Sequence, residues 1–164
     1  MALYMLRGRA NGWWLPAVAT PATEVKLTEI AAGLEFGDAV TSMSGFEPQS
    51  SKINVPIMKQ RAEAQIEGVE TFQDAVLNIA EDDGTGTDAK ALQRQDVIDT
   101  LDEGAQGYVL LSRTKQTLAV GDDAYLMAAT VGSQVPNWNL DASAAITAIN
   151  LNPSTNLRKV TVVA

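Results

Sequence analysis

Two of the residue types most used in catalysis are missing from this sequence, which has no cysteine and no histidine. Without cysteine, a disulfide framework, a thiolate nucleophile and a thiolate-bound zinc ion are excluded. Without histidine, the commonest general base, the commonest metal ligand and every Ser-His-Asp arrangement are excluded as well. Any catalysis would depend on carboxylate, Lys, Tyr or Ser side chains. We therefore expect no enzyme activity, no cofactor and no metal ion.

Basic and aromatic residues are scarce. The chain has 12 Lys and Arg residues against 20 Asp and Glu residues, a formal charge of −8 and a pI near 4.4. Binding to nucleic-acid phosphates needs a basic surface, so the charge argues against it. It does not argue against a protein that DNA passes without binding. The aromatic content of only 5% argues against a carbohydrate-binding module.

Long apolar runs are absent too. No segment approaches the ~20 apolar residues of a membrane helix, so we expect no membrane insertion. The opening segment 1–9 carries its charges after its apolar residues, the reverse of a signal peptide, which predicts a soluble protein made in the cytoplasm. With 164 residues, 46% of them hydrophobic, residues 1–164 are predicted to form one domain, with 1–12 as a flexible N-terminal arm.

Most apolar residues occur in short runs separated by Gly, Pro, Asn and Asp, which is typical of β-strands. From 62 to 67, apolar residues alternate strictly with Glu63, Gln65 and Glu67, which predicts a half-exposed antiparallel strand. Pro16 places the first predicted strand at an edge or a bulge. Further strands are predicted where short apolar runs occur, namely over 13–19, 53–57, 107–113, 124–131, 145–151 and 157–163.

Helical spacing of apolar residues occurs in three places. The first extends from Leu27 to Leu34 and predicts a short helix that Gly33 ends. Segment 72–79 fits a helix and a strand equally well, because periodicity cannot decide over so short a run.

The longer helix is predicted over 88–101. Thr87 or Asp88 can cap its N-terminus, and Gly104 can adopt the left-handed conformation after its end. Several short strands with one substantial helix predict a mainly β (α+β) fold. We expect an antiparallel β-sandwich or barrel with one flanking α-helix.

Three further features were weighed for function. The acidic loop 82–88 has the wrong spacing for a calcium loop and is predicted to be a solvated connector. Gly121-Asp122-Asp123 is predicted to be a turn between two strands. Adjacent Trp13 and Trp14 must point to opposite faces of a strand, so one is expected in the core while the other covers an edge or meets a partner.

The order of these signals resembles the major tail tube protein of long-tailed (siphophage-type) bacteriophages, especially those of Gram-positive and actinobacterial hosts. The resemblance covers roughly residues 13–164. The features that carry it are the N-terminal Trp strand, the 17–21 entry, the short helix with its Ala-Gly step at 27–34, the 44–48 loop, the extended segment 53–57, the acidic strand that ends at Gly68, the helix 88–101 and the segment 104–113.

The resemblance implies a structural virion protein of the tail, assembled in the host cytoplasm. Its subunits would form hexameric rings whose inner sheets join edge to edge, and the rings would stack into the tube that delivers the genome. Implied partners are the chain itself and the tape-measure, terminator and distal tail proteins, while double-stranded DNA passes through the lumen without specific binding. Loops 33–52 and 80–87 are expected to contact neighbouring rings, and segment 72–79 becomes a strand.

Carboxylates that line such a lumen would repel DNA phosphates. Glu63, Gln65 and Glu67 are therefore the candidate lumen-facing residues, although an ordinary solvated strand face explains them too. Alternatives from the same fold are a tail terminator, neck or baseplate-hub protein. Two alternatives from other functional classes are a β-sandwich receptor- or carbohydrate-binding module and a carboxylate-based hydrolase.

Overall fold

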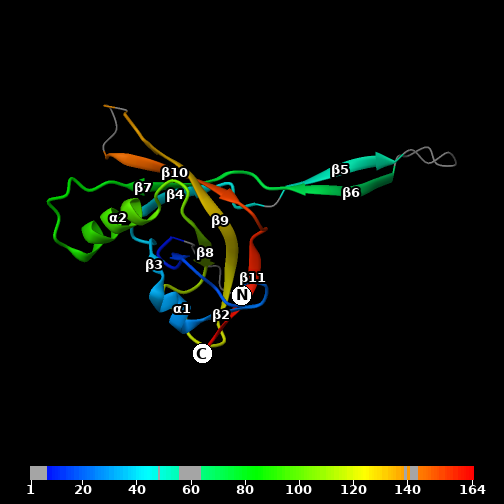
Figure 1. Cartoon of the computed structure of the whole chain (residues 1–164), viewed down its shortest axis with the longest axis horizontal. Helices are drawn as coiled ribbons and strands as arrows, with labels where there is room; N and C mark the ends of the chain where they lie inside the picture. The colour runs from blue at the N-terminus through cyan, green and yellow to red at the C-terminus, as the bar shows by residue number, and fades with distance from the viewer. Residues whose placement is uncertain (1–6, 48, 56–63, 139, 141–143) are drawn as a thin grey trace.

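The structure is a computed structural model that describes residues 7–47, 49–55, 64–138, 140 and 144–164. The described residues form a nine-stranded sheet, a separate two-stranded hairpin and two helices (Figure 1). In chain order the elements are β1 (Asn11–Leu15), β2 (Glu24–Lys26), α1 (Leu27–Ala32), β3 (Leu34–Glu35), β4 (Val40–Ser44), β5 (Gln49–Val55), β6 (Ala64–Thr71), β7 (Ala75–Ala80), α2 (Ala89–Thr100), β8 (Gln106–Ser112), β9 (Asp123–Pro136), β10 (Ile146–Pro153) and β11 (Arg158–Val163).

The large sheet has the order β3-β1-β8-β9-β10-β7-β4, and every neighbour along this path is antiparallel. β9 has 14 residues and joins two parts of the sheet. Its beginning, 123–126, pairs with β11, which also pairs in parallel with β2, while its end, 129–136, pairs with β10. The predicted mainly antiparallel β fold with a flanking helix is confirmed, and so are the central strands β8 and β9.

Two apolar cores lie on opposite sides of β1 and β8. Trp14 and Val109 belong to the core that α2, β7 and β10 complete, whereas Trp13 and Leu110 belong to the core that β2 and β11 complete. The two tryptophans point to opposite faces, as predicted. The expectation that one of them covers an edge or meets a partner is wrong, because Trp13 is 6% and Trp14 3% exposed.

The long helix α2 begins and ends as the sequence predicts. The Asp88 carboxylate accepts a hydrogen bond from the amide of Ala91 at 2.7 Å, and Gly104 has a φ of +85° beyond the helix end. The side-chain amide of Gln134 on β9 donates to the carbonyls of Ile98 and Leu101 at 2.7 and 2.6 Å, which satisfies the C-terminal end of α2. The helix therefore contacts the sheet both through its buried apolar side chains and through these hydrogen bonds.

The short helix α1 is also confirmed, but Gly33 ends it for a different physical reason than a left-handed turn. Its φ is −81°, a conformation open to any residue. The position needs glycine because an added Cβ would overlap the Leu15 side chain and lie 2.9 Å from the Trp14 carbonyl oxygen. Close approach to β1, and not backbone conformation, selects this glycine.

Several predicted boundaries differ from the structure. β1 begins at Asn11, so residues 11–12 belong to the sheet and not to the arm, and it ends at Leu15 before Pro16. The predicted loop 33–52 contains β3, β4 and the start of β5. The ambiguous segment 72–79 is largely strand β7. The short strands were missed because tertiary pairing, and not local periodicity, defines them.

Candidate assembly surface

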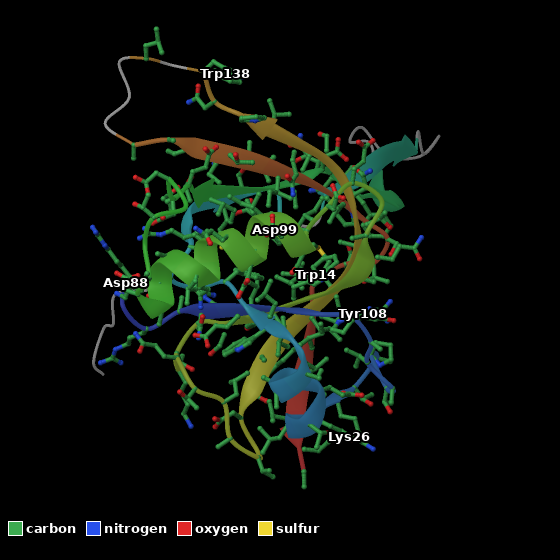
Figure 2. The ribbon with its side chains drawn as sticks, turned by 60° about the vertical axis from the view of Figure 1, so that its left-hand side comes forward. Trp14, Lys26, Asp88, Asp99, Tyr108 and Trp138 are labelled. Atoms are coloured by element: carbon green, nitrogen blue, oxygen red, sulfur yellow. The ribbon has the colours of Figure 1, made fainter. Side chains whose placement is uncertain are left out.

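Four strand segments form one layer of the molecule: β4, β7, β10 and the end of β9. In Figure 2 the helix α2 lies against one face of this layer, and none of the described helices and strands covers the opposite face. The covered face packs into the core through alternate residues such as Leu77 and Ile149, both fully buried. We call these four segments the inner layer and examine its two edges and its open face in turn.

The first edge of the inner layer is β4, which pairs with β7 on one side only among the described residues. The amide of Ala80 donates to the carbonyl of Ala39 at 3.0 Å, so the even-numbered residues of β7 bond toward β4. These residues pair with Ser42 and Ser44. By alternation, the backbone N–H and C=O of Met43 point away from the sheet and are available to another strand.

The second edge is the end of β9, beyond the part that pairs with β8. The β8 register on β9 stops at Thr130, and the carbonyl and amide of Val131 bond to Gly104 and Ala105. Further along, the amide of Asn137 donates to β10 at 2.9 Å, so alternation turns the backbone of Gln134 outward. Pro136 has the same outward orientation, as expected for a residue without an N–H at an open edge.

The two open edges are compatible with one another. Each strand of the inner layer is antiparallel to the next, so β4 and the end of β9 run in opposite directions. The outward-facing residues Met43 and Gln134 both belong to the row of residues on the covered face, together with Leu77 and Ile149. An antiparallel pairing of β4 with β9 of another copy therefore keeps both faces of the sheet continuous.

A groove follows the β4 edge. Its two lobes have volumes of about 810 and 650 Å³ and share Ala10, Asn11 and Met43. Apolar side chains contribute to both lobes, Phe36 to the first and Leu111 to the second. Met43 is 41% exposed, an unusual degree for an apolar residue of a strand that closes a core.

The connection after β9 carries a further apolar feature. Trp138 and Leu140 are 83% and 95% exposed, and they line a depression of about 300 Å³ with Pro136 and Glu81. Figure 2 shows Trp138 at the far end of β9, away from the cores. Large apolar side chains with this exposure, next to an open strand edge, mark a contact surface.

The hairpin of β5 and β6 projects well away from the large sheet (Figure 1). The strand predicted over 62–67 is confirmed from Ala64 onward as part of β6, where Gln65 pairs with Asn54 and Glu67 with Lys52. Glu63 lies outside the described residues. The structure thus places Gln65 and Glu67 on the hairpin and not in the inner layer. Their assignment to a lumen stays a prediction.

The acidic loop 82–88 is ordered by its own carboxylates. The Asp83 carboxylate accepts hydrogen bonds from the hydroxyl and amide of Thr85 at 2.6 and 2.9 Å, and these bonds lower the pKa of Asp83. Asp82 accepts from the amides of Gly84 and Gly86. Among the residues that the structure describes, no group of three or more Asp and Glu side chains is arranged to hold a metal ion.

The segment Gly121-Asp122-Asp123 forms the predicted turn into β9, with Gly121 at a φ of +89°. Lys115 donates to the Asp122 carboxylate at 2.5 Å and the Ala119 amide donates at 2.9 Å, which lowers the pKa of Asp122. Asp123 binds Lys159 at 2.7 Å, and this hydrogen bond raises the pKa of Lys159. The carboxylates are held in structural ion pairs.

Comparison with known protein families decides the identity. The sequence profile described as phage tail tube protein matches residues 1–164. The chain belongs to the phage tail tube protein family. It is a structural component of a phage tail, as the sequence resemblance predicted. The kind of host stays a prediction.

Solved structures with the same fold come from contractile injection systems. A chain of the PVC extracellular contractile injection system, in a structure of its sheath/tube terminator in the extended state, is 12% identical, with a TM-score of 0.62 and coverage of 97% of this chain and 98% of that one. A chain of the anti-feeding prophage baseplate is 10% identical, with a TM-score of 0.57 and 98% coverage of both chains. A chain of the tube-terminating cap of the same prophage is 13% identical, with a TM-score of 0.58 and coverage of 98% of this chain and 94% of that one.

These likenesses establish the fold alone. No curated protein sequence matches the chain. No helix of the described part is long and apolar enough to cross a membrane.

Proposed function

We propose that this tail tube family member polymerises as stacked, hexameric rings into the tube through which a phage genome is delivered. The observation that carries the proposal is the pair of open edges on the inner layer, β4 and the end of β9, with opposite strand directions. A rotation that places β4 of one copy beside β9 of the next gives an antiparallel pairing at every contact and closes a ring in which both edges of the inner layer are paired.

The position of the bulk of the molecule supports the same arrangement. α2, β1 and β8 lie on the covered face of the inner layer (Figure 2). In a closed ring the outer radius offers more room than the inner radius, so these elements fit on the outer side of the joined layers. A ring of joined layers therefore has this bulk outside and the open face inside. The groove along β4 and the exposed Trp138 and Leu140 supply apolar area that a neighbouring copy would bury.

Contacts between rings are assigned to the projecting hairpin and to the loop 80–87. A two-stranded hairpin of this length is only marginally stable alone, so contact with another copy gives it a packing partner. Further proposed partners are the tape-measure, terminator and distal tail proteins. Double-stranded DNA passes without specific binding, assembly takes place in the host cytoplasm, and no catalysis is involved.

Disulfide trapping tests the proposed edges, since the chain has no cysteine of its own. The double variants Ser42→Cys/Val135→Cys and Ser44→Cys/Val135→Cys place one thiol on each edge, on the same face of the inner layer. The backbones of Ser42, Ser44 and Val135 bond toward β7 or β10, so these residues would form non-hydrogen-bonded pairs across the contact. The Cβ atoms of such pairs are about 4.5 Å apart, which a disulfide can still span. We expect oxidation of assembled protein to give a ladder of covalent multimers.

Each single-cysteine variant is the matched control and should give at most a dimer. Assembled tubes that yield no ladder with either double variant would show that other edges join the subunits. A tail terminator of the same fold is the second candidate function, since the fold is shared with a terminator structure. It predicts single rings that do not lengthen as the protein concentration rises.

A further inference from the structure

The open face of the inner layer carries no charge. Although 20% of the sequence is charged, none of the residues of β4, β7, β10 and the segment 130–136 is Asp, Glu, Lys or Arg. Register places these side chains on the open face: Ser42, Ser44, Val76, Asn78, Ala80, Thr130, Ser133, Val135, Ile146, Ala148, Asn150 and Asn152. All of them are exposed or partly exposed. Solvated faces of acidic proteins ordinarily carry charges, so the exclusion is informative.

Side-chain hydrogen bonds between neighbouring strands hold the polar groups of this face in place. The side-chain amide of Asn78 donates to the Ser42 hydroxyl at 2.9 Å, and the side-chain amide of Asn150 donates to the Ser133 hydroxyl at 2.8 Å. Each bond crosses from one strand to the next, so amides and hydroxyls satisfy one another across the sheet. The face is thereby a fixed, neutral surface of hydroxyl, amide and methyl groups.

The nearest acidic residues along these strands lie at their ends. Asp74 precedes β7 and Glu81 follows it. Glu81 accepts a short hydrogen bond from Thr147, a residue of the covered-face row, and so is engaged away from the open face. The carboxylates border the neutral surface without entering it.

We propose that this uncharged face is the wall of the tube channel, and that a passing polyanion such as double-stranded DNA meets a neutral wall there and not a lining of carboxylates. The proposal rests on the proposed function, because only a ring of joined inner layers turns the face inward. A wall without cations releases no counterions when phosphates approach, so it does not bind DNA. A wall without anions avoids binding without electrostatic repulsion, and its effect on the passing chain is insensitive to salt.

Cysteine accessibility in assembled tubes tests both parts. Ala148→Cys puts the sole thiol of the chain on the open face, and Leu92→Cys puts it on α2, where the parent side chain is 48% exposed. We expect a maleimide on a long polyethylene glycol chain to label the L92C tubes but not the A148C tubes, and a small maleimide to label both. Unassembled A148C protein should react with both reagents. Val135→Cys, at a position 51% exposed, repeats the test if A148C assembles poorly.

The charge of the wall is measured with a cationic and an anionic methanethiosulfonate of equal size. For A148C tubes we expect the ratio of the two rates to differ little from that of the L92C control and to change little with ionic strength. The double variant Ala148→Cys/Asn150→Asp adds one carboxylate per subunit to the wall. At low salt, the ratio of the cationic to the anionic rate should rise about sevenfold for each kT/e of negative potential that these carboxylates create, because the two reagents carry opposite charges.

The outcomes separate the two proposals. Absence of tubes and rings contradicts the proposed function, and the wall assignment is lost with it. Tubes in which A148C reacts with the large reagent place the open face outside, which overturns the wall assignment alone. Tubes in which A148C is protected but strongly favours the cationic reagent, with a ratio that falls on addition of salt, show a carboxylate lining and overturn the neutral wall.

Discussion

Met43→Pro is a substitution that separates ring closure from folding. The Met43 amide points away from β7, so proline at this position removes one outward N–H and leaves the β4–β7 hydrogen bonds intact. Proline is tolerated in edge strands whose N–H faces solvent. The same residue in the middle of the paired sheet would be strongly destabilising. We therefore expect the isolated chain to fold with a loss of stability of at most about 1 kcal/mol.

The effect on assembly follows from the single hydrogen bond lost at each subunit contact. A backbone hydrogen bond contributes about 1 kcal/mol net, and each subunit in a ring presents one β4 edge. This loss raises the protein concentration at which tubes form by about fivefold. Paired strands lie about 4.8 Å apart, so the pyrrolidine ring also crowds the neighbouring strand and increases the effect.

The assay is sedimentation of assembled protein across a concentration series, with negative-stain images of the pellets and a thermal denaturation curve for the soluble chain. Met43→Ala is the matched control, because it removes the exposed apolar side chain and keeps the N–H. Ser44→Pro is the opposite control, since it breaks the pairing with β7 and should unfold the edge. An M43P chain that assembles at the same concentration as M43A would refute the assignment of β4 to the ring contact.

Three further results are expected. Gly33→Ala should destabilise the chain by about 1–3 kcal/mol in chemical denaturation, because the added Cβ overlaps Leu15; an unchanged midpoint would contradict the close approach. The hydrogen bond from Lys115 lowers the pKa of Asp122 in the folded chain below the value near 3.8 expected for the unfolded chain. The ionised carboxylate therefore stabilises the fold at pH values above 3.8, and this contribution is lost as the pH falls through the lower folded pKa. The melting-temperature difference between the parent chain and Asp122→Asn should thus be constant above about pH 5 and shrink below about pH 4; a difference independent of pH would count against the ion pair. Finally, a Gln65→Cys thiol in tubes should resist the long polymeric maleimide, because the hairpin is assigned to the contact with a neighbouring ring; labelling by this reagent would place the hairpin on the outer surface.

The sequence predicts the parts of this fold that local chemistry determines. The Asp88 cap, the left-handed Gly104 and the two-faced apolar run of β8 are each encoded within a few residues, and the structure has all of them. The sequence could not predict β4, because the segment 40–44 has no clear alternation and becomes a strand only by pairing with β7. The β9 edge was missed for another reason, because the strand predicted over 124–131 stops before Gln134.

The tryptophan pair shows a similar limit. Alternation predicts opposite faces for Trp13 and Trp14, but not that the sheet divides so that each face of β1 meets its own core. The uncharged strands had a visible signal in the sequence, since long segments such as 146–153 lack Asp, Glu, Lys and Arg. Which of these segments are neighbours, and that their neutral residues share one open face, depends on long-range pairing.

Cryo-electron microscopy of the purified chain across a concentration series tests the central claim most directly. The account predicts hollow tubes in which β4 of each subunit lies antiparallel to the end of β9 of the next, with Asn78, Ala148 and Asn150 on the channel wall. Tubes closed through other strands, tubes whose wall is another face of the sheet, or a chain that stays monomeric at every concentration would contradict it.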